Sequence, residues 1–167
     1  MPEKDTVFSS KIKYNGIFSF QEFYRFCYDW LKDEIGLDIN EDKYSEKLSG
    51  NEKNIEVKWT ANKKITDYFK YEFEITMQII GLVKVEIQQD GKKIKTNSGS
   101  IEVKMKGNLV RDYKGNFETN ALNKLFRGIY DKVLIKSKVE KYQDKLAEEC
   151  NEFLYQAKAY LDLEGKK

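Results

Sequence analysis

The sequence predicts an α+β protein in which an antiparallel sheet of about six strands carries one N-terminal helix and a long C-terminal helical segment on one face. Three observations lead to this fold class. Large apolar residues occupy every second position from 69 to 79, a helix start signal surrounds Ser19, and apolar residues recur every three or four positions from 135 to 160. With 167 residues and no Gly/Ser-rich linker, we expect a single domain over 1–167.

The firmest strand prediction rests on strict alternation of apolar and polar residues. Six apolar side chains point to one face and charged or polar ones to the other, as in a half-buried strand. The apolar set is Phe69, Tyr71, Phe73, Ile75, Met77 and Ile79. Gly81 is expected to end this strand, and residues 83–87 are expected to run back.

The remaining strands follow weaker versions of the same pattern. We expect them at Val7–Tyr14 (ending at Asn15-Gly16), at 44–48, at 55–59, around Ile94 and from 101 to about 113. Turns are predicted at Gly50-Asn51, at 62–64, at Asp90-Gly91 and at 97–99. Gly107 interrupts the last strand, which indicates a bulge or a sharp bend.

The predicted N-terminal helix has a complete set of start signals. Ser19 suits the N-cap, Glu22 completes a capping box, and Phe18 can pack against Phe23. Gly36 is expected to end this helix.

The C-terminal helical segment is expected to begin at Asn116 and to carry two apolar stripes. The first covers 122–129, and the second runs from Ile135 to Tyr160. A second helix of about 25 residues would be about 38 Å long at 1.5 Å per residue.

The composition excludes several kinds of chemistry. The chain has no histidine, so histidine-based nucleophilic catalysis and histidine-ligated zinc are excluded. No glycine-rich phosphate-binding motif occurs, and we expect no cofactor and no metal. Cys27 and Cys150 both fall on apolar helix stripes, which predicts two buried free thiols. Charged ends of strands, such as Asp67 and Arg111-Asp112, are interpreted as local ion pairs and not as catalytic groups.

Charge and hydropathy limit the classes of partner. The net charge is +2, and the basic side chains between Lys92 and Lys141 lie on faces that the aromatic residues do not share, so nucleic acid is not expected as a partner. The longest uncharged run, Ile75–Val83, is too short to span a membrane. Free thiols and a charged N-terminus with no apolar leader favour a cytoplasmic location.

The order of the expected elements (strand, helix, antiparallel strands, long helix) is similar to that of the START/SRPBCC helix-grip family. The resemblance covers most of the chain and implies an apolar ligand held between the sheet and the C-terminal helix. The inward side chains there either line such a cavity or fill it as core. They are Trp59, Phe69, Tyr71, Phe73 and Met77.

Two functional hypotheses follow, and a third is retained. The first is a non-catalytic interaction or assembly module, with a protein partner or a second copy docking on apolar residues of the C-terminal helix. These residues are Leu154, Tyr155, Leu161 and Leu163. The second is a helix-grip carrier of a small apolar ligand. The third is an enzyme that relies on a carboxylate or a lysine.

Overall fold

The computed structural model describes residues 3–115, 125, 129 and 136–166 of the chain. The expected N-cap at Asn116 and the expected helix start at Ile135 lie outside these residues, as does most of the stripe 122–129. Only Leu125 and Ile129 of that stripe are described, and both are helical.

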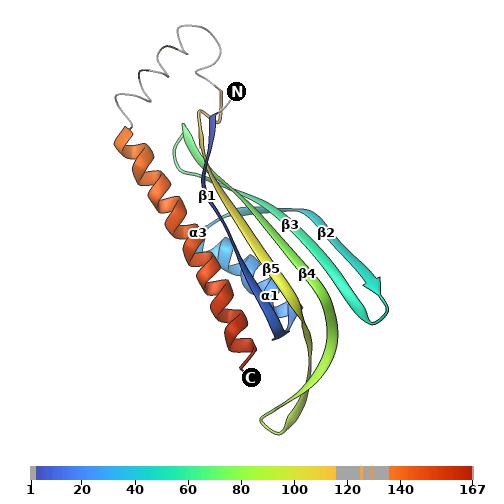
Figure 1. The fold of residues 1–167 in the computed structure, drawn as a ribbon. Helices are drawn as coiled ribbons and strands as arrows, with labels where there is room; N and C mark the ends of the chain where they lie inside the picture. Colours follow the sequence, from blue (N-terminus) through green and yellow to red (C-terminus); the bar gives the residue numbers. More distant parts are fainter. Residues whose placement is uncertain (1–2, 116–124, 126–128, 130–135, 167) are drawn as a thin grey trace.

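A single antiparallel sheet of five strands forms the centre of the molecule (Figure 1). The strands are β1 (Glu3–Phe18), β2 (Asp38–Ser49), β3 (Glu52–Lys64), β4 (Phe69–Gln89) and β5 (Lys92–Arg111). Their order across the sheet is β1-β5-β4-β3-β2. The α+β class and the antiparallel sheet are therefore confirmed, whereas the expected number of about six strands is wrong.

The difference in strand number arises because the sequence predicts breaks at glycines that lie inside strands. Gly81 lies inside β4, where it forms a β-bulge: Ile80 pairs with Ser100 and Val83 with Ser98, so two β4 residues stand opposite Gly99. Gly81 has a φ of +65°, a conformation that glycine adopts without strain. Its N–H donates to Oδ1 of Asn54 at 3.0 Å. The expected strand end at Gly81 and the expected turn at 97–99 are both wrong.

The end of β1 shows the same error, a turn predicted where the strand continues. The Asn15-Gly16 pair continues β1, where it stands opposite Ser100 and Gly99, so the strand that was expected to end at Tyr14 runs on to Phe18. Likewise, residues 62–64 belong to β3 and do not form the predicted turn. The turns at Gly50-Asn51 and Asp90-Gly91 are confirmed.

The bulge at Gly81 exchanges the two faces of β4. Before it, the odd-numbered residues are buried on the face that carries the helices, which we call the helix face. After it, Lys84 pairs with Asn97, and the even-numbered residues Leu82 and Lys84 lie on the helix face. Beyond the pair Lys84–Asn97, β4 and β5 pair only with each other and form a two-stranded arm, 85–96, that projects past the sheet (Figure 1).

Two helical segments pack on the helix face. Helix α1 (Phe20–Trp30) continues into a π-helical turn, η1 (Leu31–Ile35), and ends at Gly36 with a φ of +81°. The predicted N-cap is confirmed, because Oγ of Ser19 accepts from the backbone N–H of Glu22 at 3.3 Å. Helix α3 (Lys136–Glu164) lies along β1 and β5, in agreement with the expected long C-terminal helix.

Aromatic contacts join α3 to α1. The rings of Phe26 and Tyr160 stack with centroids 4.6 Å apart, and the rings of Trp30 and Phe153 lie 5.8 Å apart. Such ring pairs stabilise by about 0.5–1.5 kcal/mol beyond the area they bury. The two helices therefore form one layer over the sheet.

The space between α3 and the sheet is filled by side chains. All five residues predicted as cavity lining or core are buried, each at most 2% exposed: Trp59, Phe69, Tyr71, Phe73 and Met77. The hydroxyl of Tyr71 donates to the backbone carbonyl of Tyr142 at 2.7 Å, which ties β4 to α3. These residues are part of the protein's own core.

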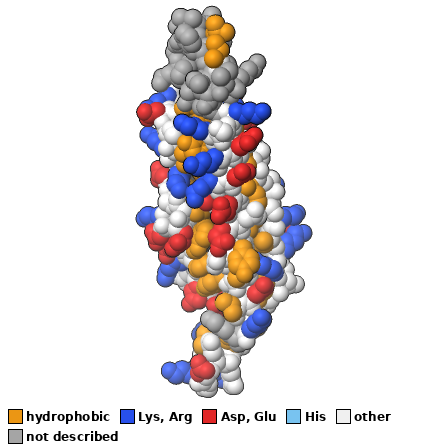
Figure 2. All heavy atoms as spheres, turned by 90° about the vertical axis from the view of Figure 1, so that its left-hand side faces the viewer, with side chains coloured by type: hydrophobic (Ala, Val, Ile, Leu, Met, Phe, Trp, Pro, Cys, Tyr) orange, Lys and Arg blue, Asp and Glu red, His pale blue; other side chains and the backbone are white. Residues whose placement is uncertain are grey.

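The predicted partner surface on the C-terminal helix is wrong for two of its four residues. Leu154 and Leu161 are buried in the core, because α3 packs against both the sheet and α1. Tyr155 and Leu163 are exposed, at 68% and 63%. On this side of the molecule charged side chains interrupt the hydrophobic ones (Figure 2).

The irregularity predicted at Gly107 lies in the neighbouring strand. The register between β1 and β5 shifts between Thr6 and Phe8, and Phe8 pairs with Gly107. Gly107 itself allows α3 to approach closely, since a Cβ atom there would lie 2.8 Å from Sγ of Cys150. In the described part of the chain, no helix combines the length and the hydropathy that crossing a bilayer requires.

Candidate ligand-binding groove

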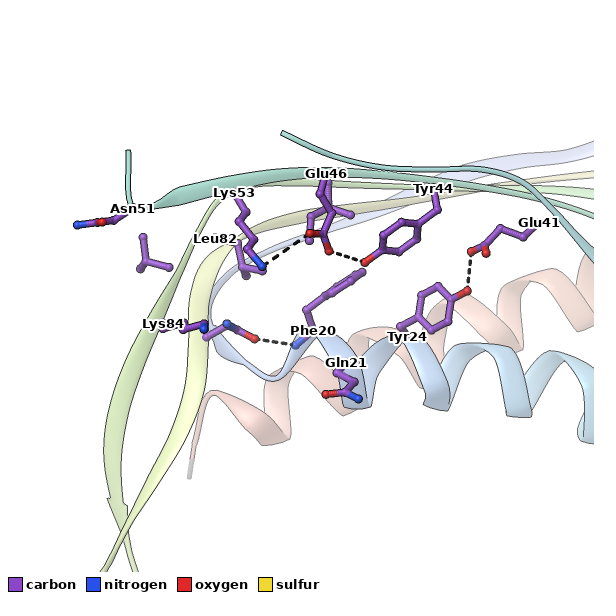
Figure 3. Close-up of a pocket in the computed structure, with 13 residues that line it drawn as sticks. Phe20, Gln21, Tyr24, Glu41, Tyr44, Glu46, Asn51, Lys53, Leu82 and Lys84 are labelled. Carbon is purple, nitrogen blue, oxygen red and sulfur yellow. Dashed lines mark hydrogen bonds and ion pairs between the residues drawn. The ribbon is translucent and has the colours of Figure 1, made fainter. Parts of the chain in front are cut away.

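A groove of about 910 Å³ opens on the helix face, at the end of the sheet where α1 begins (Figure 3). Its walls come from four segments: the first turn of α1, β2, the start of β3 and the base of the β4–β5 arm. The side chains of β2 that line the groove are exposed to solvent. The volume lies in the range of about 300–1,000 Å³ that is typical of ligand pockets.

The positions of the β2 side chains depend on a second bulge. Glu41 pairs with Trp59 and Lys43 with Lys58, so Asp42 is the extra residue. Beyond this bulge the alternation changes from odd to even numbers, and Tyr44 and Glu46 join Glu41 on the helix face. The bulge therefore places three polar side chains of β2 in the groove.

Three aromatic rings form a continuous wall along the groove. The ring of Tyr24 lies 6.0 Å from that of Phe20 and 6.1 Å from that of Tyr44, both in edge-to-face geometry. Tyr24 also contacts Trp59 of the core, with centroids 5.1 Å apart. Because each ring supports the next, the wall is positioned before any ligand arrives.

Two carboxylates hold the tyrosines of this wall. Oε1 of Glu41 accepts from the hydroxyl of Tyr24 at 2.5 Å and from the indole N–H of Trp59 at 3.2 Å. Glu46 accepts from the hydroxyl of Tyr44 at 2.8 Å. Figure 3 shows both hydroxyls directed at their carboxylates. Glu41 and Glu46 thus fix the two rings in place.

These contacts change the acidity of the tyrosines. Burial raises the pKa of Tyr24 to about 12, and the hydrogen bond to Glu41 adds to this shift. Burial, followed by the hydrogen bond to Glu46, also raises the pKa of Tyr44. A neutral phenol donates to a carboxylate, whereas a phenolate would be repelled by it. Both hydroxyls therefore stay protonated at neutral pH and act as fixed donors.

The other end of the groove carries lysines and amides. Nζ of Lys53 lies 3.7 Å from Glu46. Lys84 enters from the base of the arm because the Gly81 bulge turns it to the helix face. Beside it, Oδ1 of Asn97 accepts from the backbone N–H of Phe20 at 3.2 Å and so fixes the start of α1 to β5.

The residues predicted from the sequence as site candidates lie mostly outside the groove. Only Trp59 contributes, through its hydrogen bond to Glu41. Both cysteines are buried free thiols, as predicted. Burial raises the pKa of Cys27 well above its ordinary value and that of Cys150 to about 12, which disfavours reactive thiolates. Among the described residues, no group of three or more potential ligands could hold a metal ion.

Comparison with known proteins found no matching family model, no matching curated protein and no matching solved structure. The function is therefore inferred from the groove itself.

The tie between Tyr24 and Glu41 can be tested by titration. In the wild-type protein, the Tyr24 hydroxyl should titrate near 12, so its contribution to stability is complete below pH 10 and is lost as the pH rises through about 12. In Glu41→Gln, the pKa of Tyr24 should fall but stay above its ordinary value, because burial, the larger cause, persists. NMR titration of ¹³C-labelled tyrosine measures this pKa. An unchanged pKa in Glu41→Gln would contradict the described contact.

Proposed function

We propose that this protein is a non-catalytic binding module whose ligand occupies the groove between α1, β2 and the base of the arm. The observation that carries the proposal is the preformed wall: three aromatic rings lie in contact, and two of them are held by carboxylates of β2. Preorganised apolar surface with a few fixed polar groups is typical of binding sites.

The packing of α3 favours the groove as the binding site and argues against a cavity beneath this helix. In a helix-grip carrier, the ligand would separate the sheet from the C-terminal helix. Here Leu146, Cys150 and Phe153 of α3 are completely buried against the sheet and α1. The helix-grip resemblance stays a prediction, and the groove, which mixes polar and apolar side chains, suits an amphipathic ligand better than a purely apolar one.

Chemical shift mapping on the full chain tests the proposal. The probe is anilinonaphthalene sulfonate, an amphipathic aromatic anion. We expect the amide shifts to change in the first turn of α1, in β2 and at the base of the arm. Tyr44→Ser should weaken binding of the probe about fivefold or more, because it removes one ring of the wall.

Tyr155→Ser is the matched control, because Tyr155 is an exposed tyrosine of α3 outside the groove. It should leave the affinity unchanged. Shift changes located elsewhere, or equal losses in the two variants, would overturn the proposal.

A further inference from the structure

The groove holds four charged side chains, and only two of them pair with each other. Glu46 and Lys53 form an ion pair at 3.7 Å in the middle of the groove. Glu41 accepts only from the neutral donors Tyr24 and Trp59. Among the described residues, neither Glu41 nor Lys84 forms an ion pair. In Figure 3 these two side chains lie at opposite ends of the groove.

The register of the sheet gives the length of the groove. Trp59 stands opposite Glu41, and Lys53 stands opposite Leu82, two residues before Lys84. Trp59 and Lys53 are separated by six residue steps along β3, or about 20 Å at about 3.3 Å per step. A groove of this length matches an extended chain of about six residues, which rises by the same distance per residue.

Side-chain amides also line the groove. Gln21, Asn51 and Asn97 each present a carboxamide. Asn97 uses its oxygen for the backbone of Phe20, which leaves its N–H₂ group to donate. A carboxamide offers both donors and acceptors, the combination that a peptide backbone requires. The ion pair Glu46–Lys53 in the middle of the groove, together with these amides, makes the groove too polar for an acyl chain.

We propose that the ligand is an extended peptide segment of about six residues from a partner protein, with a basic side chain at the Glu41 end and a carboxylate at the Lys84 end. Apolar or aromatic side chains between them contact the rings of Phe20, Tyr24 and Tyr44. This inference rests on the proposed function and specifies its ligand. Charge complementarity at the two ends sets the direction and register of the peptide.

Selection from a phage-displayed library of random hexapeptides on the full chain tests this inference. We expect enriched sequences to combine one Lys or Arg with one Asp or Glu about five positions away, with aromatic or apolar residues between. Binding of a selected peptide should weaken about fivefold in Glu41→Gln and in Lys84→Gln, and also on raising the salt concentration. Lys47→Gln, on the open face of β2, should bind as the wild type does.

Exchanging the two charges provides the decisive comparison. Selection on the double variant Glu41→Lys/Lys84→Glu should yield peptides with the opposite order of charges. Enriched peptides without a charge preference, no enrichment at all, or displacement of the peptides by the fatty acid palmitate would overturn the peptide inference. In those cases the proposed function still stands if anilinonaphthalene sulfonate shifts the groove resonances. If no probe shifts them, both proposals fall.

Discussion

Replacing Phe153 with alanine is expected to lower the free energy of unfolding by about 3–5 kcal/mol, the range typical of large aromatic deletions in a core. Phe153 is fully buried, and its ring lies 5.8 Å from that of Trp30. It therefore fills the junction where α3 meets both α1 and the sheet. The loss should be visible as a lower midpoint in urea denaturation followed by circular dichroism, with an unchanged slope.

Tyr155→Ala, two positions further along the same helix, is the control for this prediction. Tyr155 is 68% exposed, and its replacement should change the stability by no more than about 0.5 kcal/mol. Both variants gain the same residue in α3, so a difference between them reports burial and not helix propensity. If Phe153→Ala and Tyr155→Ala lowered the stability by similar amounts, the side of α3 that carries Phe153 would not face the core.

The strongest local patterns in the sequence predicted the centre of the fold correctly. The alternation from Phe69 to Ile79 places one face of β4 in the core, and the signals at Ser19 and Glu22 mark the start of α1. In both places local preference and tertiary packing favour the same structure. Such agreement makes a segment predictable from the sequence alone.

The bulges are where prediction from the sequence failed. An extra residue in one strand exchanges the faces of everything beyond it, and its position depends on pairing with the neighbouring strand. Gly81 reads as a strand end because glycine suits both turns and bulges. Only the contacts with Asn54 and Ser100 show that β4 continues through it.

The groove could not be found from the sequence for the same reason. The bulge at Asp42 breaks the alternation of β2, so the sequence predicts a strand only in its second half, at 44–48. Glu41 and Tyr44 lie on the same face although one residue number is odd and the other even. Lys84 reaches the groove only because of the Gly81 bulge. The site is assembled by irregularities of the sheet, whereas the sequence predicts candidates only at regular positions of strands and helices.

The error at Leu154 and Leu161 has a different physical origin. A helix that packs on a sheet alone buries a narrow stripe, and the apolar residues beside that stripe would be left for a partner. Helix α3 also packs against α1, which widens the buried sector. An apolar spacing of three and four residues does not show how many elements pack against a helix. The sequence alone therefore predicts these leucines on the surface.

Gly107→Ala is expected to destabilise the protein by about 1–3 kcal/mol, the usual cost of overpacking. A Cβ atom at this position would lie 2.8 Å from Sγ of Cys150 and 3.3 Å from Cδ1 of Leu146. In a strand without such neighbours, the same replacement would stabilise by roughly 0.5–1 kcal/mol, because alanine loses less conformational entropy on folding. The sign of the effect therefore decides whether α3 lies this close to β5.

A double-mutant cycle with Cys150→Ala separates the clash from other consequences of the substitution. Removing the sulfur should by itself cost stability, since Cys150 is completely buried. In the double variant, the new methyl group occupies the space that the sulfur leaves. The combined loss should then be smaller than the sum of the single losses, by about 0.5–3 kcal/mol as for residues in contact. Additive losses would mean that the strain of Gly107→Ala arises within β5 itself and not from contact with Cys150. The close approach of α3 to β5 would then not depend on the glycine.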